Sequence, residues 1–194
     1  MASAPSVEEF PSSTLVVLVA DLAGYALAFR TRSDAEMVRL LDRYYRVAEG
    51  VITESGGRVV KFMGDSVLAV YEESDGPIAV AAAVMLEAAV ASLSRDLGFQ
   101  VSLGVNVHLG SVIEAELGSG RTRRPDVFGR TVNQAFLLGR GPGIRISEPV
   151  YRKLPSGERT PWTRNRPPAV YGLGDDAGVY EGLRKAASEN ASRW

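Results

Sequence analysis

The chain has 194 residues, of which 45% are hydrophobic, and a formal net charge of −1. This length suits one domain with a full-sized core, and the nearly neutral charge gives no overall field that would attract nucleic acid or an anionic membrane. The absence of cysteine excludes disulfides, thiolate metal sites and a cysteine nucleophile, and a single histidine disfavours a zinc site built on histidines.

An apolar run at residues 14–21 ends in Asp21. It predicts a central strand buried on both faces, and the following residues 22–25 predict a glycine-containing turn at its carboxyl end. Residues 1–13 are polar, contain two prolines and lack the pattern of a secretory signal. We therefore expect a flexible N-terminal tail and a cytoplasmic protein.

A long amphipathic helix is expected next. Ser33 and Glu36 have the spacing of a capping box, and apolar residues recur at helical spacing as far as Ile52. Gly56 and Gly57 then give a natural stop.

The stretch at residues 58–71 predicts a β-hairpin, because two runs rich in β-branched residues flank a turn that contains Gly64 and Asp65. Taken alone, the hairpin is more typical of plain structure, with Asp65 as a turn former and Lys61 as a solvated strand end. If the first strand lies beside it, Asp21 and Asp65 converge and offer the hard oxygen ligands that Mg²⁺ prefers.

The apolar residues 77–93 are few for a membrane span, include Glu87 and are dominated by alanine, so they predict a buried helix. Residues 100–108 alternate as a strand. The order strand, helix, hairpin, helix, strand predicts an α+β fold with a ferredoxin-like βαββαβ core, in which helices pack on one face of an antiparallel sheet.

The remaining chain predicts shorter elements: a strand at 112–117, a solvated basic loop at 119–124, a helix at 128–140, and extra C-terminal strands at 144–146, 170–172 and 178–180. No internal repeat marks a second domain. We expect one domain over residues 14–183 and a C-terminal tail over residues 184–194.

Four ordered segments resemble those of a known family: ADLAGY at 20–25, VKFMGDSVLAV at 60–70, LGVNVHLGSV at 103–112 and DVFGRTVNQA at 126–135. They are similar to the catalytic domain of class III nucleotide cyclases, the adenylate and guanylate cyclases. The resemblance implies attack of a ribose 3′-hydroxyl on the first phosphate of the same nucleoside triphosphate, which gives a 3′,5′-cyclic nucleotide and pyrophosphate.

The resemblance also implies the metal and phosphate contacts. Asp21 and Asp65 match the family's two ligands for a pair of Mg²⁺ or Mn²⁺ ions, which suit this reaction because they activate the hydroxyl and neutralise phosphate charge. The turn that contacts the phosphates matches Leu22, Ala23, Gly24 and Tyr25.

Lys61 and Asp126 match the family's adenine-selecting pair in position and type. Lysine only donates and an ionised aspartate only accepts, so Lys61 at N1 and Asp126 at N6 suit adenine and leave guanine mismatched. The resemblance therefore implies ATP, with a guanylate cyclase as the weaker option. Without the motif, Asp126 is more typical of a helix cap or a partner for Arg123 or Arg124.

The α-helix after this motif departs from the family. Asn133 matches the asparagine that positions the ribose, but Leu137, four residues later on the same face, replaces the arginine that stabilises the transition state. Arg140, a further turn along, is the candidate substitute, or else a cation at the end of the helix. Tyr171 stands where the family has a phosphate-contacting lysine.

In the family, one protomer supplies the metal ligands and the other supplies the base and ribose contacts. This chain carries both sets, so the resemblance implies a symmetric homodimer with two equivalent ATP sites. We expect no nucleic-acid or membrane partner. His108 has no predicted metal-ligand partner, so a structural role is expected.

Two functions from different classes fit these residues. The retained metal, base and ribose residues favour an adenylate cyclase of low activity. Leu137 and Tyr171 favour the alternative, a catalytically degenerate cyclase homology domain that binds nucleotide and serves as a regulatory or dimerisation module.

Overall fold

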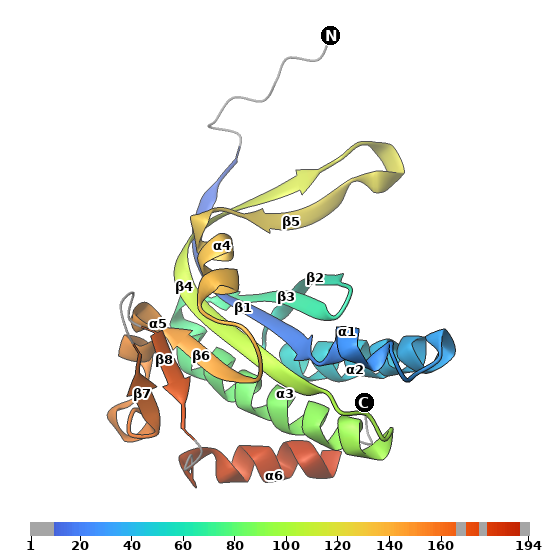
Figure 1. Ribbon diagram of the computed structural model, residues 1–194. Helices are drawn as coiled ribbons and strands as arrows, with labels where there is room; N and C mark the ends of the chain where they lie inside the picture. The colour runs from blue at the N-terminus through green and yellow to red at the C-terminus, as the bar shows by residue number, and fades with distance from the viewer. Residues whose placement is uncertain (1–9, 166–169, 175–177, 191–194) are drawn as a thin grey trace.

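The computed structural model describes residues 10–165, 170–174 and 178–190. These residues form one eight-stranded sheet with helices on both faces (Figure 1). The strands are β1 Ser12–Ala23, β2 Arg58–Met63, β3 Ser66–Glu72, β4 Ser102–Leu117, β5 Arg124–Phe128, β6 Gly143–Ser147, β7 Trp162–Arg164 and β8 Val170–Leu173. The helices are α1 Tyr25–Ala28, α2 Asp34–Glu54, α3 Gly76–Asp96, α4 Arg130–Leu137, α5 Glu148–Lys153 and α6 Glu181–Asn190.

The strand order is β2-β3-β1-β4-β6-β8-β7, with β5 paired to β4 off this path. β1 pairs antiparallel with β3 on one side and β4 on the other. The first four strands of that order, with α2 and α3, form the predicted ferredoxin-like core, and β6, β8 and β7 extend it.

Both faces of β1 are buried, as predicted. Val16 and Leu18 face the main core with α2 and α3, whereas Val17 and Val19 face a smaller core with α4. The strand begins at Ser12, so the expected tail over residues 1–13 is wrong for its last two residues. Residues 1–9 of that tail lie outside the described residues.

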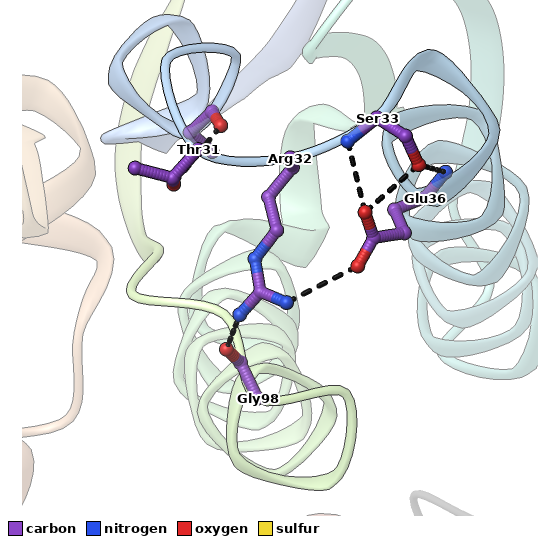
Figure 2. A network of polar contacts seen from close by, with 6 residues as sticks. Thr31, Arg32, Ser33, Glu36 and Gly98 are labelled. Atoms are coloured by element: carbon purple, nitrogen blue, oxygen red, sulfur yellow. Dashed lines mark hydrogen bonds and ion pairs between the residues drawn. The ribbon is translucent and has the colours of Figure 1, made fainter.

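The predicted capping box begins α2. Ser33 Oγ accepts from the Glu36 backbone N–H at 3.4 Å, and Glu36 Oε2 accepts from the Ser33 backbone N–H at 2.8 Å. Figure 2 shows how Arg32 extends this network by bonding both Glu36 and the Gly98 carbonyl. The start of α2 is thereby tied to the loop that follows α3.

α3 lies within a segment, Glu73–Asp96, that is long and apolar enough to cross a membrane by composition alone. In the fold, 67% of its most apolar window is buried against the rest of the protein. The predicted buried helix is confirmed, and Arg184 of α6 pairs with its Glu87 at 3.3 Å.

β4 is one continuous strand, so the two strands expected at 100–108 and 112–117 are joined. Its outer half pairs with β5 as a ribbon that projects from the body of the sheet (Figure 1). The basic loop at 119–124 lies at the tip of this ribbon, where Arg123 pairs with Glu116 at 2.9 Å.

The C-terminal predictions need correction. Residues 184–190, expected in a tail, form the last seven of the ten residues of α6, in which Ala187 is buried in the main core. The strand expected at 178–180 is a short 3₁₀ helix, whose Tyr180 hydroxyl accepts from Trp162 Nε1 at 3.3 Å. α6 carries few apolar residues, so its helical period is weak in the sequence. Residues 191–194 lie outside the described residues.

Candidate active site

Asp21 and Asp65 lie next to each other at one end of the sheet. Asp21 pairs in register with Ser66 of β3, and Asp65 occupies the hairpin turn just before Ser66. The Leu22 backbone N–H donates to the Asp65 carbonyl at 3.1 Å. Both acids line a cavity of about 360 Å³, here called the acid cavity, and the fold thus brings together the two residues predicted to converge.

The electrostatics of this cavity favour a bound cation. Burial and the nearby charge of Asp65 raise the pKa of Asp21, while Arg145 and Arg140 act in the opposite direction. A carboxylate that is partly desolvated beside a second carboxylate is stabilised in its charged form by a cation.

Two neighbouring tyrosines of α2 hold the backbone just before each acid. Tyr44 Oη donates to the Ala20 carbonyl at 3.3 Å, and Tyr45 Oη donates to the Gly64 carbonyl at 2.6 Å. Burial raises the pKa of Tyr44, so its hydroxyl stays a neutral donor. These supporting contacts were not predicted, because helical periodicity shows which face of α2 is buried but not which turn its hydroxyls reach.

Lys61 and Asp126 form an ion pair between β2 and β5. Lys61 Nζ lies 2.6 Å from Asp126 Oδ2, and the two side chains are 38% and 19% exposed. The other carboxylate oxygen accepts from the Val127 backbone N–H at 2.8 Å. Asp126 is therefore a partner of Lys61 rather than a helix cap or a partner of the loop arginines.

Lys61 also lines a second cavity of about 520 Å³, here called the base cavity, together with Asn133 of α4. Phe136 lines both this cavity and the acid cavity. Lys61 and Asn133, predicted to contact the base and the ribose, therefore line one cavity, which shares Phe136 with the cavity of the predicted metal ligands.

α4 ends at Leu137, so the helix predicted over 128–140 is too long at both ends. The expectation that Arg140 continues the same helix face is wrong, because the chain turns into a glycine-rich loop in which Gly141 has a φ of 77°. Arg140 nevertheless lines the acid cavity from this loop. Leu137 lines the same cavity and is 78% exposed.

The loop that carries Arg140 is held by two side chains. The Arg145 guanidinium donates to the carbonyls of residues 140–143 at 2.8 to 3.3 Å, and Asn106 Nδ2 donates to the Gly139 carbonyl at 3.0 Å. A Cβ at Gly139 would lie 2.4 Å from Arg145 Cδ, so glycine permits this close approach. Neither contact was predicted, because the glycine-rich residues 139–143 indicated only that the helix ends there.

A family model described as the adenylate and guanylate cyclase catalytic domain matches residues 7–170. The chain belongs to this class III nucleotide cyclase family. The cyclase domain is 26% identical over 153 residues to an adenylate cyclase of Anabaena cylindrica, covering 72% of this chain and 30% of that protein. It is 32% identical over 131 residues to an adenylate cyclase of Streptomyces coelicolor, covering 68% of this chain and 31% of that protein. The chain thus spans less than a third of the length of these relatives.

Solved structures agree on the fold. A guanylyl cyclase crystal structure matches with a TM-score of 0.76 at 22% identity, covering 86% of this chain and 96% of that one. The adenylyl cyclase CyaB from P. aeruginosa matches with a TM-score of 0.75 at 16% identity, with the same coverage. The cyclase domain therefore has the predicted catalytic fold.

The donor set of the cyclase domain fits a divalent cation. Among the described residues no group of three or more metal-binding side chains occurs, so Asp21 and Asp65 are the acids on offer in this cavity. Asn106 also lines this cavity, but its Oδ1 is closed off from solvent, so it is not counted as a ligand. Carboxylates are hard ligands, and substrate phosphates and water complete such a shell.

The turn predicted to contact phosphates is only partly available in the cyclase domain. Leu22 is buried in the core and its N–H is taken by the Asp65 carbonyl, so this amide is not free for a phosphate. Ala23 ends β1, and Gly24, with a φ of 91°, precedes α1. Burial, and then the charge of Asp65, raise the pKa of Tyr25, whose side chain is half-buried.

Two other residues of the cyclase domain contribute to packing. Tyr171 is buried in the core and stacks on Tyr151 with ring centroids 3.8 Å apart, so it does not line either cavity. His108 bonds Gln134 of α4 at 2.9 Å through Nε2.

Proposed function

We propose that the domain is an adenylate cyclase that converts ATP to 3′,5′-cyclic AMP and pyrophosphate. The observation that carries this proposal is the convergence of Asp21 and Asp65 in one cavity, which fits a cation-bound triphosphate. The base cavity is lined by Lys61, whose ion-pair partner Asp126 completes the pair of groups that suits adenine.

Base selection rests on the Lys61–Asp126 pair. Lys61 Nζ donates to adenine N1, and the Asp126 carboxylate, which Val127 orients through its other oxygen, accepts from N6. Guanine presents a donor to Lys61 and an acceptor to Asp126, which leaves both contacts mismatched.

In the acid cavity, Asp21 and Asp65 would hold a pair of Mg²⁺ or Mn²⁺ ions. Ions bound there would lower the pKa of the attacking ribose hydroxyl and neutralise the negative charge of the phosphates. Arg140, fixed through its loop by Arg145, stabilises the negative charge that grows on the attacked phosphate, while Asn133 orients the ribose.

A symmetric homodimer would complete both sites. Phe128, Phe136 and Leu137 are apolar residues exposed by 36%, 38% and 78% beside the two cavities, which marks this face for contact. Pairing the acid cavity of one protomer with the base cavity of its partner gives two equivalent sites.

A second candidate is a nucleotide-binding regulatory or dimerisation module without catalysis. The observation that favours it is Leu137, which gives the acid cavity an apolar side chain where the family has an arginine. If the domain is a cyclase, the charge of Arg140 replaces the missing arginine charge at position 137. If the domain is a regulatory module, Arg140 does not replace it.

Incubation of the purified protein with ATP or GTP and Mn²⁺ separates the two. Cyclic AMP that disappears in Asp65→Asn supports the cyclase, because asparagine keeps the turn but removes the charge. Asp42→Asn, which changes an exposed acid of α2, is the matched control and should retain activity. ATP binding without any cyclic product supports the module instead.

A further inference from the structure

Lys61 and Asp126, the two members of the base-contacting ion pair, come from strands that are far apart in the sheet. β3, β1 and β4 lie between β2 and β5 in the pairing order. Among the described residues no backbone hydrogen bond joins β2 to β5, because β2 is paired with β3 and β5 with β4. The alignment of Lys61 with Asp126 therefore depends on side-chain contacts between the two strands.

A bulge in β2 sets the face to which Lys61 belongs. In the β2–β3 ladder Arg58 lies opposite Val70 and Lys61 lies opposite Leu68, with a shift in register between Val59 and Lys61. Val70 and Leu68 both face the smaller core, so Arg58 and Lys61 share that face. In a regular strand, residues three apart point to opposite faces. The bulge thus gives the two cations of β2 one common face.

These two cations pair with two acids of the β4–β5 ribbon. Arg58 pairs with Glu114 of β4, and Lys61 pairs with Asp126 of β5 at 2.6 Å. Glu114 and Asp126 belong to adjacent residue pairs of the ribbon ladder, so the two bridges are neighbours. Neither Arg58 nor Glu114 is among the residues that line the base cavity. The Arg58–Glu114 bridge therefore joins β2 to the ribbon without occupying the space of the base.

The base-contacting pair has two tasks that compete. When adenine is bound, Lys61 donates to N1 and Asp126 accepts from N6, so part of the hydrogen bonding that joins the strands is directed to the base. β2 and β5 also share the smaller core, but apolar packing is non-directional and does not fix where polar atoms point. The Arg58–Glu114 pair is directional and keeps its partner when the base is bound.

We propose, building on the adenine contacts of the proposed function, that Arg58 and Glu114 are positioning residues that keep Lys61 and Asp126 aligned for the base. Adenine uses both contacts and gains from their alignment, whereas guanine is mismatched with both and gains little. The Arg58 and Glu114 side chains are 50% and 39% exposed. The expected effect is that of a solvated ion pair, about two- to fivefold in affinity.

Binding of 3′-deoxy-ATP and 3′-deoxy-GTP with Mn²⁺, measured by isothermal titration calorimetry, tests this role. Both analogues lack the attacking hydroxyl, so they report base selection without turnover. Arg58→Met and Glu114→Gln should each weaken binding of 3′-deoxy-ATP about two- to fivefold and leave binding of 3′-deoxy-GTP nearly unchanged. Exchanging the charges, with Arg58→Glu and Glu114→Arg together, should restore much of the preference for the adenine analogue.

Arg46→Met, which breaks the exposed Arg46–Asp42 pair within α2, is the matched control and should bind both analogues like the unaltered protein. A merely structural role for Arg58 and Glu114 would weaken both analogues alike, and that result overturns the proposal. Unchanged binding of 3′-deoxy-ATP by both single variants also overturns it, as does a folded charge exchange that recovers none of the preference.

Failure of the proposed function gives a different result, namely no cyclic AMP from ATP. Binding of the analogues requires no catalysis, so it decides the role of Arg58 and Glu114 even in a protein that makes no product. Unaltered protein that binds the two analogues equally, or binds neither, overturns the proposal, because no base contact is then present to be aligned.

Discussion

Arg140 is the residue on which the proposed catalytic rate depends most. Its charge lies close enough to Asp21 to offset part of the rise in the pKa of that acid, and the carbonyls around it are held by Arg145. Replacing Arg140 with methionine should therefore remove a preorganised cation while leaving its loop in place. One such transition-state contact commonly contributes about 2.7 to 4 kcal/mol, which corresponds to roughly 10² to 10³ in kcat.

Among the residues that the structure describes, no nearby group is free to compensate. Leu137 has no charge, and the guanidinium of Arg145 is occupied by the four carbonyls of residues 140–143. We therefore expect the full loss of about 10²-fold or more in kcat, with a smaller change in KM for ATP.

The assay is initial rates of cyclic AMP formation over a range of ATP concentrations with Mn²⁺. Arg121→Met, at the tip of the β4–β5 ribbon, is the matched control and should keep its rate. Adding Leu137→Arg to Arg140→Met should recover part of the loss, because position 137 lines the acid cavity and is exposed enough to accept a longer side chain. A folded Arg140→Met with unchanged kcat would refute the role given to Arg140.

The base and metal contacts give two further predictions. Lys61→Glu should reduce the preference for ATP over GTP at least about tenfold, with Lys185→Glu of α6 as control, and unchanged relative turnover would count against the adenine contact. Because the folded-state pKa of Asp21 is raised, its ionisation lowers stability as pH rises from the ordinary value of 3.8 through the raised value. Metal-free Asp21→Asn should therefore melt at a higher temperature than the unaltered protein at pH 7, with the gap closing as the pH falls below 3.8, and should lose the stabilisation by Mn²⁺. A lower melting temperature for metal-free Asp21→Asn than for the unaltered protein at pH 7 would contradict the claim that ionised Asp21 destabilises the fold.

The predictable parts of the fold are those with strong periodic patterns. β1 is a continuous apolar run because both its faces are buried, and the β2–β3 hairpin is set by Gly64 and Asp65. Once these strands are neighbours, antiparallel pairing alone places Asp21 beside the turn. That geometry needs no information beyond the local patterns.

The contacts that support the site were not predictable in the same way. The hydroxyls of Tyr44 and Tyr45 reach carbonyls 24 and 19 residues away, and the Arg145 guanidinium closes around a loop whose path depends on glycine. Hydrophobic periodicity carries no signal for such polar contacts. The early end of α4 before Gly139 likewise separated Arg140 from the helix face that the sequence spacing suggested.

The central claim is that two identical chains share each site, with acids from one and base and ribose contacts from the other. Co-expression of Asp65→Asn with Asn133→Ala tests it, because each variant alone spoils both sites of its own homodimer. Free mixing makes half of the dimers mixed, each with one intact site, so about a quarter of the unaltered activity should return. Activity no higher than that of the two variants assayed separately, in a preparation shown to contain mixed dimers, would contradict the claim.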